Sequence, residues 1–332
     1  MLNRIIYFGY YLKKLDWNKL ITFQQFVRMK NEKGIISQWI GVLSNSLRYN
    51  ISILEYYQFG FFEKKHEEKI SWAGTGTMYE YQRIMNPPSD RIILDDKRKF
   101  YKNYKEYFVN KVYELNELEK DTMLINELYT FNKLVFKVSN GKCGESVKIL
   151  KTSEIEKDDL IAFTKSNGYD MVETFIQQHP DLNKLSPSAV NTVRIFTQLD
   201  RSKNVEILGC RQRISINSSV DNMAAGNAAA SINDESGVIE GPGYFSDITK
   251  EPIYFHPVTK TQVIGFKVPF WKECVQLAKD AALKHPENRS IGWDIVVTQN
   301  GPGLIEGNHD WCKLVWQLPV NRGLKSLLKT HV

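Results

Sequence analysis

Residues 291–308, IGWDIVVTQNGPGLIEGN, decide the architecture of the C-terminal half of this chain. Two short apolar runs flank the turn signal Asn300-Gly301, which predicts a β-hairpin. Because side chains alternate across a strand, Glu306 and Asn308 share one face, and the turn brings Asp294 close to Glu306 on that face. Two carboxylates and an amide oxygen form a hard-oxygen site that suits Mg²⁺ or Mn²⁺. The alternative is a solvated hairpin with ordinary surface acids.

The composition is that of a globular protein with about two domains. Of the 332 residues, 42% are hydrophobic and 25% are charged. No apolar run approaches the ~18 residues of a membrane span. The formal charge of +6 allows anionic partners such as nucleotides or sugar phosphates. The sequence lacks the clustered Lys/Arg blocks of nucleic-acid binders, so no nucleic-acid partner is expected.

The cysteines and the N-terminus favour a cytoplasmic location. Four cysteines lie far apart and form no C-x-x-C pair, so neither a disulfide framework nor a zinc site is predicted. The N-terminus shows no small-residue cleavage site of a secretory signal. Tyrosines and Phe8 stand among cations in residues 4–14. Such a segment most often packs on its own protein, and weak association with a membrane surface is the alternative.

The chain divides into three regions by pattern. Residues 1–90 form an aromatic-rich, mainly helical module, with helices over 17–29 and 34–47. Ser52 offers an N-cap with Glu55 three residues on. The dipeptide Pro87-Pro88 marks the end of this module.

Residues 91–178 mix helices and strands and are expected to form a first lobe. Helices are predicted from Asp96 through Phe108, over 114–126 and over 155–165, the last opened by the pair Ser153 and Glu156. Strands are predicted over 91–94, 134–138, 146–150 and 171–176.

Residues 179–332 are expected to form a second lobe that contains the metal site. Strands over 190–199, 205–216 and 228–232 precede a helix over 270–284 and the hairpin. Two lobes of strands with interleaved helices indicate an α+β or α/β enzyme.

Several side chains are candidates for binding anions. Lys137 ends a predicted apolar strand just before a loop with Gly141 and Gly144, whose amides can approach phosphates. A plain hairpin with a solvent-facing lysine is the alternative. Arg194, and Arg211 with Arg213 two residues apart on one face, suit phosphate or carboxylate oxygens, or a structural ion pair.

Other polar residues carry weaker signals. Glu173 stands near the end of its strand, where it could offer a carboxylate to a purine edge or be an ordinary strand-end acid. Asp221-Asn222 opens a small-residue loop that could admit substrate or form a packing corner. His256 lies in a turn segment, where a single histidine more often has a structural role than a catalytic one.

In this order and spacing, the segments resemble the ATP-grasp superfamily, and most of all its sugar-transfer-associated branch, over roughly residues 50–315. The resemblance implies an α+β fold of two lobes, here preceded by a helical module in place of the usual α/β pre-domain. It rests on Asp96-Lys97, Lys137 and its loop, residues 172–176 (VETFI), 188–194 (SAVNTVR), Asp221-Asn222, His256-Pro257, Asp294, and Glu306-Gly307-Asn308.

The resemblance also implies roles for these residues, with ATP and Mg²⁺ bound between the lobes. Lys97 and Lys137 would hold phosphates, with Gly141 and Gly144 beside them. Adenine would be read by Glu173 and the backbone of Phe175 and Ile176. The metal would be bound by Asp294, Glu306 and Asn308. The transferred phosphoryl group would be stabilised by Arg194 or Arg213. Substrate contacts would come from Arg211, Asp221, Asn222 and His256. Metal ligands of this kind are expected on the solvent side, where they contribute little to the core.

The leading hypothesis is an ATP-dependent carboxylate–amine ligase that forms an amide through an acyl phosphate. The family context suggests an amino acid and a sugar acid of a surface polysaccharide as its small-molecule or sugar-linked substrates. A kinase for a sugar or hydroxyl acceptor uses the same residues and is the first alternative. A non-catalytic protein that binds nucleotides or polyanions is the second.

Overall fold

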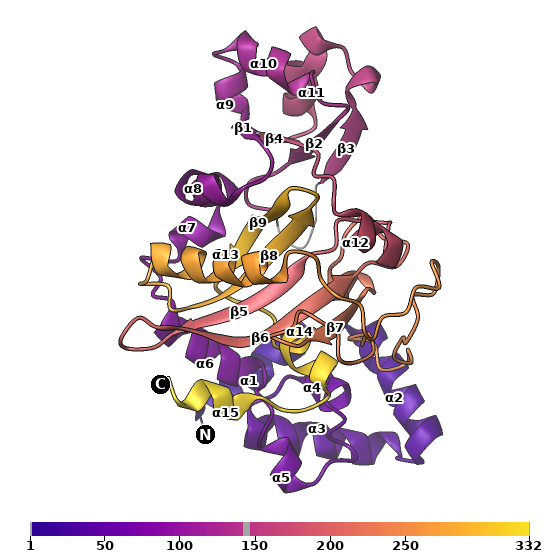
Figure 1. The fold of residues 1–332 in the computed structure, drawn as a ribbon. Helices are drawn as coiled ribbons and strands as arrows, with labels where there is room; N and C mark the ends of the chain where they lie inside the picture. Colours follow the sequence, from indigo (N-terminus) through magenta and orange to yellow (C-terminus); the bar gives the residue numbers. More distant parts are fainter. Residues whose placement is uncertain (1, 142–146, 332) are drawn as a thin grey trace.

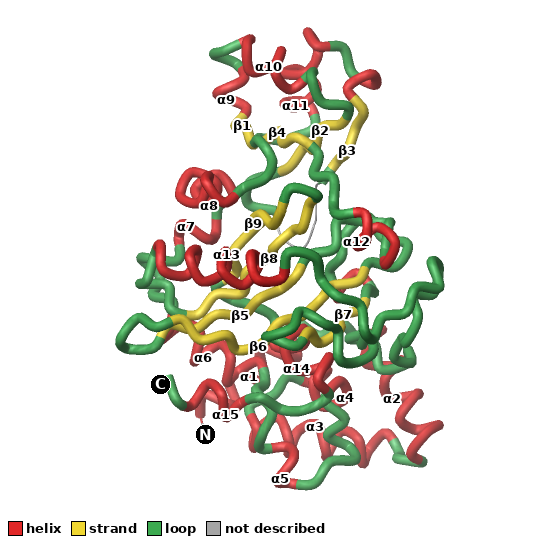
Figure 2. Tube along the Cα trace, in the orientation of Figure 1, coloured by secondary structure: helices red, strands yellow, loops and turns green. Residues whose placement is uncertain are grey.

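The computed structural model describes residues 2–141 and 147–331. A four-stranded sheet lies at one end of the molecule, a five-stranded sheet in the middle, and the N-terminal helices at the other end (Figure 1). Figure 2 shows the same division, with strands confined to the two sheets. The predicted α+β class with an N-terminal helical region is confirmed.

Helices fill the chain up to residue 104. They are α1 Leu2–Lys13, α2 Trp17–Asn31, α3 Ile35–Tyr49, α4 Ile53–Gln58, α5 His66–Lys69, α6 Thr75–Met85, α7 Ile92–Asp95 and α8 Lys97–Tyr104. Aspartate side chains cap α2 and α8: Asp16 accepts a hydrogen bond from the Lys19 amide, and Asp96 accepts one from the Arg98 amide. The Asp96 cap makes Lys97 the first residue of α8.

The first sheet is antiparallel and has the order β1-β4-β2-β3. Its elements are β1 Val112–Glu114, α9 Leu115–Leu118, α10 Thr122–Leu128, β2 Lys133–Lys137, β3 Lys148–Lys151, α11 Leu160–Ser166 and β4 Met171–Thr174. One face packs Leu134, Phe136 and Val172 against these helices. Because side chains alternate, the other face carries Lys137 and Glu173.

The second sheet is also antiparallel, with the order β7-β6-β5-β8-β9. Its region contains α12 Pro180–Leu185, β5 Val193–Leu199, β6 Val205–Ile214, β7 Ala228–Ile232, α13 Trp271–Lys284, β8 Ser290–Thr298, β9 Gly301–Asn308, α14 Lys313–Gln317 and α15 Lys325–Lys329. Helix α13 covers one face of this sheet (Figure 1).

The N-terminal helices share a core with the opposite face of the second sheet. Phe196 of β5 and Leu208 of β6 belong to one apolar cluster with Tyr57, Trp72 and Trp316. The Phe59 and Trp72 rings stack in this cluster at 4.5 Å between centroids. The helical module and the second sheet are therefore packed as one body.

Three sequence-based assignments are wrong. Residues 91–94, expected as a strand, contribute to the helix α7, because Ile93 and Leu94 pack on the core of the second sheet. The helix expected over 114–126 is the end of β1 followed by α9 and α10. The helix expected from residue 155 begins at Leu160 and lacks the Ser153–Glu156 cap. Within the described residues, no helix has the length and apolar character needed to cross a bilayer.

A buried ion pair joins the helical module to the C-terminal helices. Glu55 contacts Lys313 at 2.9 Å and accepts hydrogen bonds from Ser52 and Thr75. Burial raises the pKa of Glu55, but Lys313 and the hydrogen-bond donors outweigh it and hold the pKa below 4.5. The predicted Ser52–Glu55 cap is confirmed by the bond from the Ser52 amide to Glu55.

We expect this pair to make stability depend on pH. A carboxyl with a lowered folded-state pKa stabilises the fold above its unfolded pKa, and this stabilisation is lost as pH falls through the folded value. Glu55→Gln should lower the free energy of unfolding, measured by urea titration at neutral pH, by about 3 kcal/mol, because the mostly buried Lys313 loses its counter-ion. The difference from wild type should shrink below about pH 4. The exposed Glu67→Gln is the control; a constant difference across this range would contradict the prediction.

Candidate functional site

The register of the second sheet aligns four candidate residues in one row across its strands. Arg194 of β5 lies opposite Arg211 of β6 on one side and opposite Asp294 of β8 on the other. Asp294 in turn lies opposite Glu306 of β9. Directly opposed residues of antiparallel strands project to the same face, so the row presents two arginines and two carboxylates together.

A β-bulge puts Glu306 in this row. The β8–β9 register pairs Ile295 with Leu304 but Asp294 with Glu306, so one extra residue, Ile305, is accommodated in β9. Without the bulge, Ile305 would stand opposite Asp294. The two-residue turn lies at 299–300 and is followed by Gly301 with a φ of 120°, one position before the predicted turn. The predicted hairpin is confirmed, with this one-residue difference.

Asp294 is held by two arginines. Its carboxylate oxygens accept hydrogen bonds from Nε of Arg194 at 2.5 Å and Nη2 of Arg194 at 2.7 Å, and from Nη1 of Arg213 at 3.0 Å. Burial raises the pKa of Asp294, but the two guanidinium groups outweigh it and hold the pKa well below the usual range. Asp294 is only 2% exposed. The expectation of a solvent-side residue that contributes little to the core is wrong for Asp294, because its partners come from β5 and β6.

Glu306 and Asn308 lie beside Asp294 at the end of β9. Burial and the negative charge of Asp294 raise the pKa of Glu306, which hydrogen-bonds to Asp294. Asn308 Nδ2 donates to Glu306 Oε1 at 3.2 Å. A carboxylate has about four lone-pair sites, so Asp294 can hold both arginines and still offer an oxygen toward Glu306. Two facing carboxylates with an adjacent amide fit a hard divalent cation, and phosphate and water oxygens could complete its shell.

Arg213 connects Asp294 to the loop after β6. Its Nη2 contacts Asp221 Oδ1 at 2.6 Å and also donates to Asn222. Asp221 accepts two further bonds from Thr192, one from the amide and one from the hydroxyl. Burial lowers the pKa of Arg213, and Asp221 and Asp294 outweigh it and raise the pKa. Asp221 and Asn222 therefore hold Arg213 in place in this structure.

The first sheet brings Lys137 and Glu173 together. Their strands β2 and β4 are paired, and the ammonium contacts Glu173 Oε2 at 2.7 Å. Asn110 donates to the same oxygen at 3.2 Å. The polar face of the first sheet thus presents a paired cation and anion.

Lys97, at the start of α8, is bonded to the first sheet through the loop after β2. Its ammonium donates to the carbonyl oxygens of Ser139 and Gly141, in the loop after β2. Burial lowers the pKa of Lys97, the charge of Lys137 lowers it further, and Glu306 and Glu173 oppose this shift. Lys97 is therefore within electrostatic range of Lys137 from the first sheet and of Glu306 from the second.

Gly307 explains how α8 comes so close to the hairpin. A Cβ atom there would lie 2.8 Å from Trp293 and 3.1 Å from Phe100 of α8. The missing side chain therefore lets Phe100, and with it α8, pack closely against β9. Glycine between Glu306 and Asn308 thus has a packing reason.

The remaining nucleotide candidates lie near the two ends of β2. Phe175 follows β4, and its ring lies 4.9 Å from the Lys133 ammonium. Ile176 is half-buried next to it. The Gly141 amide bonds to the Val138 carbonyl and closes a turn, whereas Gly144 lies outside the described residues.

Two candidates bond to other parts of the fold. Arg211 donates to the Trp316 carbonyl through Nε and Nη2 and so ties α14 to the second sheet. His256 bonds through Nε2 to the Ser215 carbonyl, and its Nδ1 accepts from the amides of Val258 and Thr259. Both ring nitrogens of His256 therefore organise the turn.

The sequence reading missed Asp170. Its carboxylate accepts bonds from the Ser139 amide at 2.7 Å and the Ser139 hydroxyl at 2.6 Å. These bonds anchor the start of the loop whose carbonyls bind Lys97. Asp170 stands directly before a predicted strand, but its partner is 31 residues away, so only the strand pairing could have revealed it.

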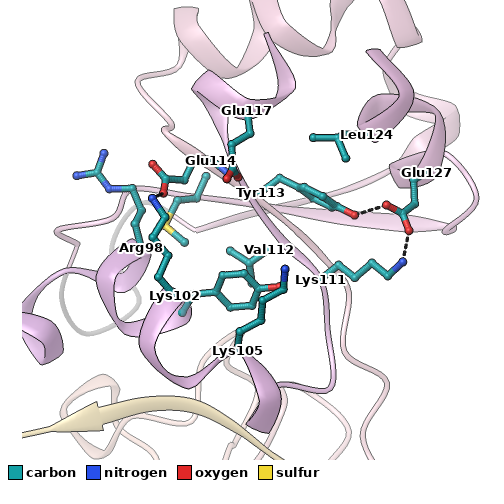
Figure 3. A pocket seen from close by; sticks show the side chains of 12 residues that line it. Arg98, Lys102, Lys105, Lys111, Val112, Tyr113, Glu114, Glu117, Leu124 and Glu127 are labelled. Carbon is teal, nitrogen blue, oxygen red and sulfur yellow. Dashed lines mark hydrogen bonds and ion pairs between the residues drawn. The ribbon is translucent and has the colours of Figure 1, made fainter. Parts of the chain in front are cut away.

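A separate pocket of about 540 Å³ lies between α8 and β1 (Figure 3). Arg98, Lys102 and Glu117 are among the residues that line it. Lys102 pairs with Glu114 at 2.5 Å, and Glu127 bonds to Lys111 and Tyr113. Its charges are largely satisfied by one another, and its lining includes none of the candidate residues above.

Solved structures with a similar fold are distant. An ADP complex of N5-carboxyaminoimidazole ribonucleotide synthetase has 10% identity, a TM-score of 0.39, and coverage of 65% of this chain and 45% of its own. A biotin carboxylase–ATP complex from Campylobacter jejuni has 15% identity, a TM-score of 0.44, and coverage of 72% and 46%. A D-alanine–D-alanine ligase from Bacillus anthracis has 14% identity, a TM-score of 0.42, and coverage of 78% of this chain and 74% of its own.

The chain spans less than half the length of the first two of these proteins. Similarity at this level does not bear on the reaction or the substrate. No curated protein sequence matches the chain.

The family assignment rests on a match to the sequence itself. A family model described as sugar-transfer associated ATP-grasp matches residues 77–331, which is more than half of the chain and contains every candidate residue discussed above. The chain belongs to the sugar-transfer associated ATP-grasp family.

Proposed function

We propose that this protein is an ATP- and Mg²⁺-dependent carboxylate–amine ligase that forms an amide through an acyl phosphate. The observation that carries the proposal is the row formed by Arg194, Asp294 and Glu306, with Lys97 in electrostatic range of Glu306. Its family contains ATP-dependent ligases. An amino acid and a sugar acid are the proposed substrate classes.

The first sheet would hold the nucleotide. Lys97 and Lys137 supply two ammonium groups for phosphate oxygens, and both are already partly buried, which strengthens their attraction for an anion. When phosphate is bound, Lys137 would exchange part of its contact with Glu173, freeing that carboxylate to accept from the adenine amino group. Backbone groups at Phe175 and Ile176 would complete the adenine contacts.

The second sheet would hold the phosphate end of ATP, where the reaction takes place. Asp294, Glu306 and Asn308 would bind Mg²⁺, which neutralises charge on the phosphates. Arg194 uses Nε and Nη2 on Asp294, which leaves Nη1 for a phosphoryl or substrate oxygen. Arg213 is engaged at all three nitrogens, including a long contact from Nε to the Asp221 carbonyl, so its proposed role is to position Asp294.

The proposed reaction has two steps. A carboxylate oxygen of the substrate attacks the γ-phosphorus, and the bond to the β–γ bridging oxygen breaks to release ADP. The amine then attacks the acyl carbon, inorganic phosphate leaves with its electron pair, and the nitrogen loses a proton. Both steps need positioning and charge stabilisation, and neither needs an enzyme nucleophile.

The test is ADP release from Mg·ATP with uronic acids and amino acids, alone and in pairs. We expect ADP release that requires both partners, and a product whose mass equals acid plus amine minus water. With an ¹⁸O-labelled carboxylate, one labelled oxygen should pass to inorganic phosphate. A phosphorylated sugar with no labelled phosphate would instead identify a kinase, and ATP binding without ADP release in any mixture would refute both.

A further inference from the structure

Positive charge and exposed apolar side chains are both concentrated in the first 50 residues. This segment has eight Lys and Arg against two Asp and Glu, a difference equal to the formal charge of +6 of the whole chain. The rest of the chain is therefore balanced. Within the described residues, ten of the 24 exposed large apolar side chains also fall here.

The exposed apolar side chains lie on the outer faces of three helices. On α1, Ile6 and Tyr10 are one turn apart with Ile5 beside them, whereas Tyr11 on the opposite side is buried in the core. On α3, Ile36, Ile40 and Leu43 follow one another at helical spacing. Ile6, Ile36 and Ile40 are 61%, 79% and 65% exposed.

Helix α2 continues this surface. Trp17 and Ile21 are one turn apart on its outer side and both are exposed. The Trp17 ring lies 6.5 Å from Trp39 of α3, and Arg4 of α1 donates to the carbonyls of Leu47 and Arg48 at the end of α3. The three helices are thus fixed beside one another, and we name Ile5, Ile6, Tyr10, Trp17, Ile21, Ile36, Ile40 and Leu43 the N-terminal apolar surface.

Exposed cations accompany this surface. Lys13 and Lys14 follow the outer face of α1, and Arg28 lies on the same side of α2 as Trp17 and Ile21. Apolar side chains that enter the boundary of lipid tails, with cations at the level of the headgroups, are the pattern of helices that lie on a membrane. Exposed apolar side chains that gather on a soluble protein and are rimmed by polar residues mark an interaction site.

We propose that the N-terminal apolar surface docks on a lipid bilayer with anionic headgroups. Charge complementarity selects this partner: two copies of a face with this positive charge repel each other, whereas anionic lipid attracts it. In Figure 1, α2 and α3 lie at the opposite end of the molecule from the first sheet. Docking there leaves the first sheet away from the bilayer. The inference does not depend on the proposed ligase reaction.

Sedimentation of the full chain with vesicles tests the proposal. We expect binding to phosphatidylcholine vesicles that contain about one third phosphatidylglycerol, little binding to phosphatidylcholine alone, and loss of binding at high salt. Lys13→Gln/Lys14→Gln should weaken binding about fivefold for each lysine removed. The matched control, Lys157→Gln/Lys165→Gln in the first lobe, should bind like wild type.

The apolar part has its own variants. Ile36→Ser/Ile40→Ser should weaken vesicle binding at least tenfold and leave the melting temperature unchanged, because both side chains are exposed. Tyr254→Ser/Val258→Ser, two exposed apolar residues elsewhere, is the control. Equal sedimentation with anionic and neutral vesicles would overturn the proposal. So would a dimer in light scattering that Ile36→Ser/Ile40→Ser dissociates while vesicles bind nothing, since the surface would then contact a second copy.

Discussion

Glu306→Gln is expected to reduce ADP release by at least about 100-fold while the protein stays folded. Changes in the outer partners of metal ligands typically cost 10- to 100-fold, and loss of a carboxylate that itself binds the cation should cost more. The substitution keeps the shape of the side chain and its contact with Asn308. It also removes one of two facing carboxylates, so the melting temperature should be unchanged or higher.

The readouts separate a metal role from a structural one. The Mg²⁺ concentration for half-maximal activity should rise, and nucleotide binding in the absence of metal should be unaffected. Glu206→Gln, an exposed carboxylate on β6 of the same sheet, should change neither quantity. Turnover within fivefold of wild type would remove Glu306 from the proposed site, and a lower melting temperature would mean that it supports the fold.

Asp294→Ala should destabilise the protein by about 3–5 kcal/mol, because it leaves two buried arginines without their shared counter-ion. The free energy of unfolding, obtained by urea titration at neutral pH, measures this loss. Activity should disappear as well, but here the stability is the informative quantity. An unchanged urea midpoint would show that Arg194 and Arg213 reach water or another anion when Asp294 is absent.

A second variant makes this prediction sharper. In Arg194→Leu/Asp294→Leu both members of one pair are apolar, and Arg213 keeps Asp221. Apolar replacement of a buried pair is often close to neutral, so the double variant should be more stable than Asp294→Ala. A double variant that is less stable than Asp294→Ala would assign the loss to packing instead of unpaired charge.

The sequence predicted what depends on local pattern. Alternation and the turn signal were enough to predict the hairpin and to bring Asp294 near Glu306. The bulge at Ile305 could not be predicted, because the sequence of residues 299–308 is equally compatible with a strand register shifted by one residue. The apolar run 92–94 has the composition of a strand, and only its packing against the second sheet makes it helical.

Burial and long-range partners could not be predicted in the same way. Asp294 reads as a surface acid in its hairpin, and its environment depends on Arg194, which is 100 residues away. The contact between Lys137 and Glu173 follows from the pairing of β2 with β4, which a single sequence does not reveal. Residue types at the candidate site were therefore predictable, whereas their partners were not.

The cluster that joins Tyr57 and Trp72 to Phe196 and Trp316 has a consequence for how this protein is handled and how it evolves. The family match begins at residue 77, yet trimming the chain there would remove aromatic residues from the core and expose one apolar face of the second sheet to water. The segment matched by the family model is therefore shorter than the segment that shares one core. Substitutions in the N-terminal helices and in the second sheet must remain compatible with each other.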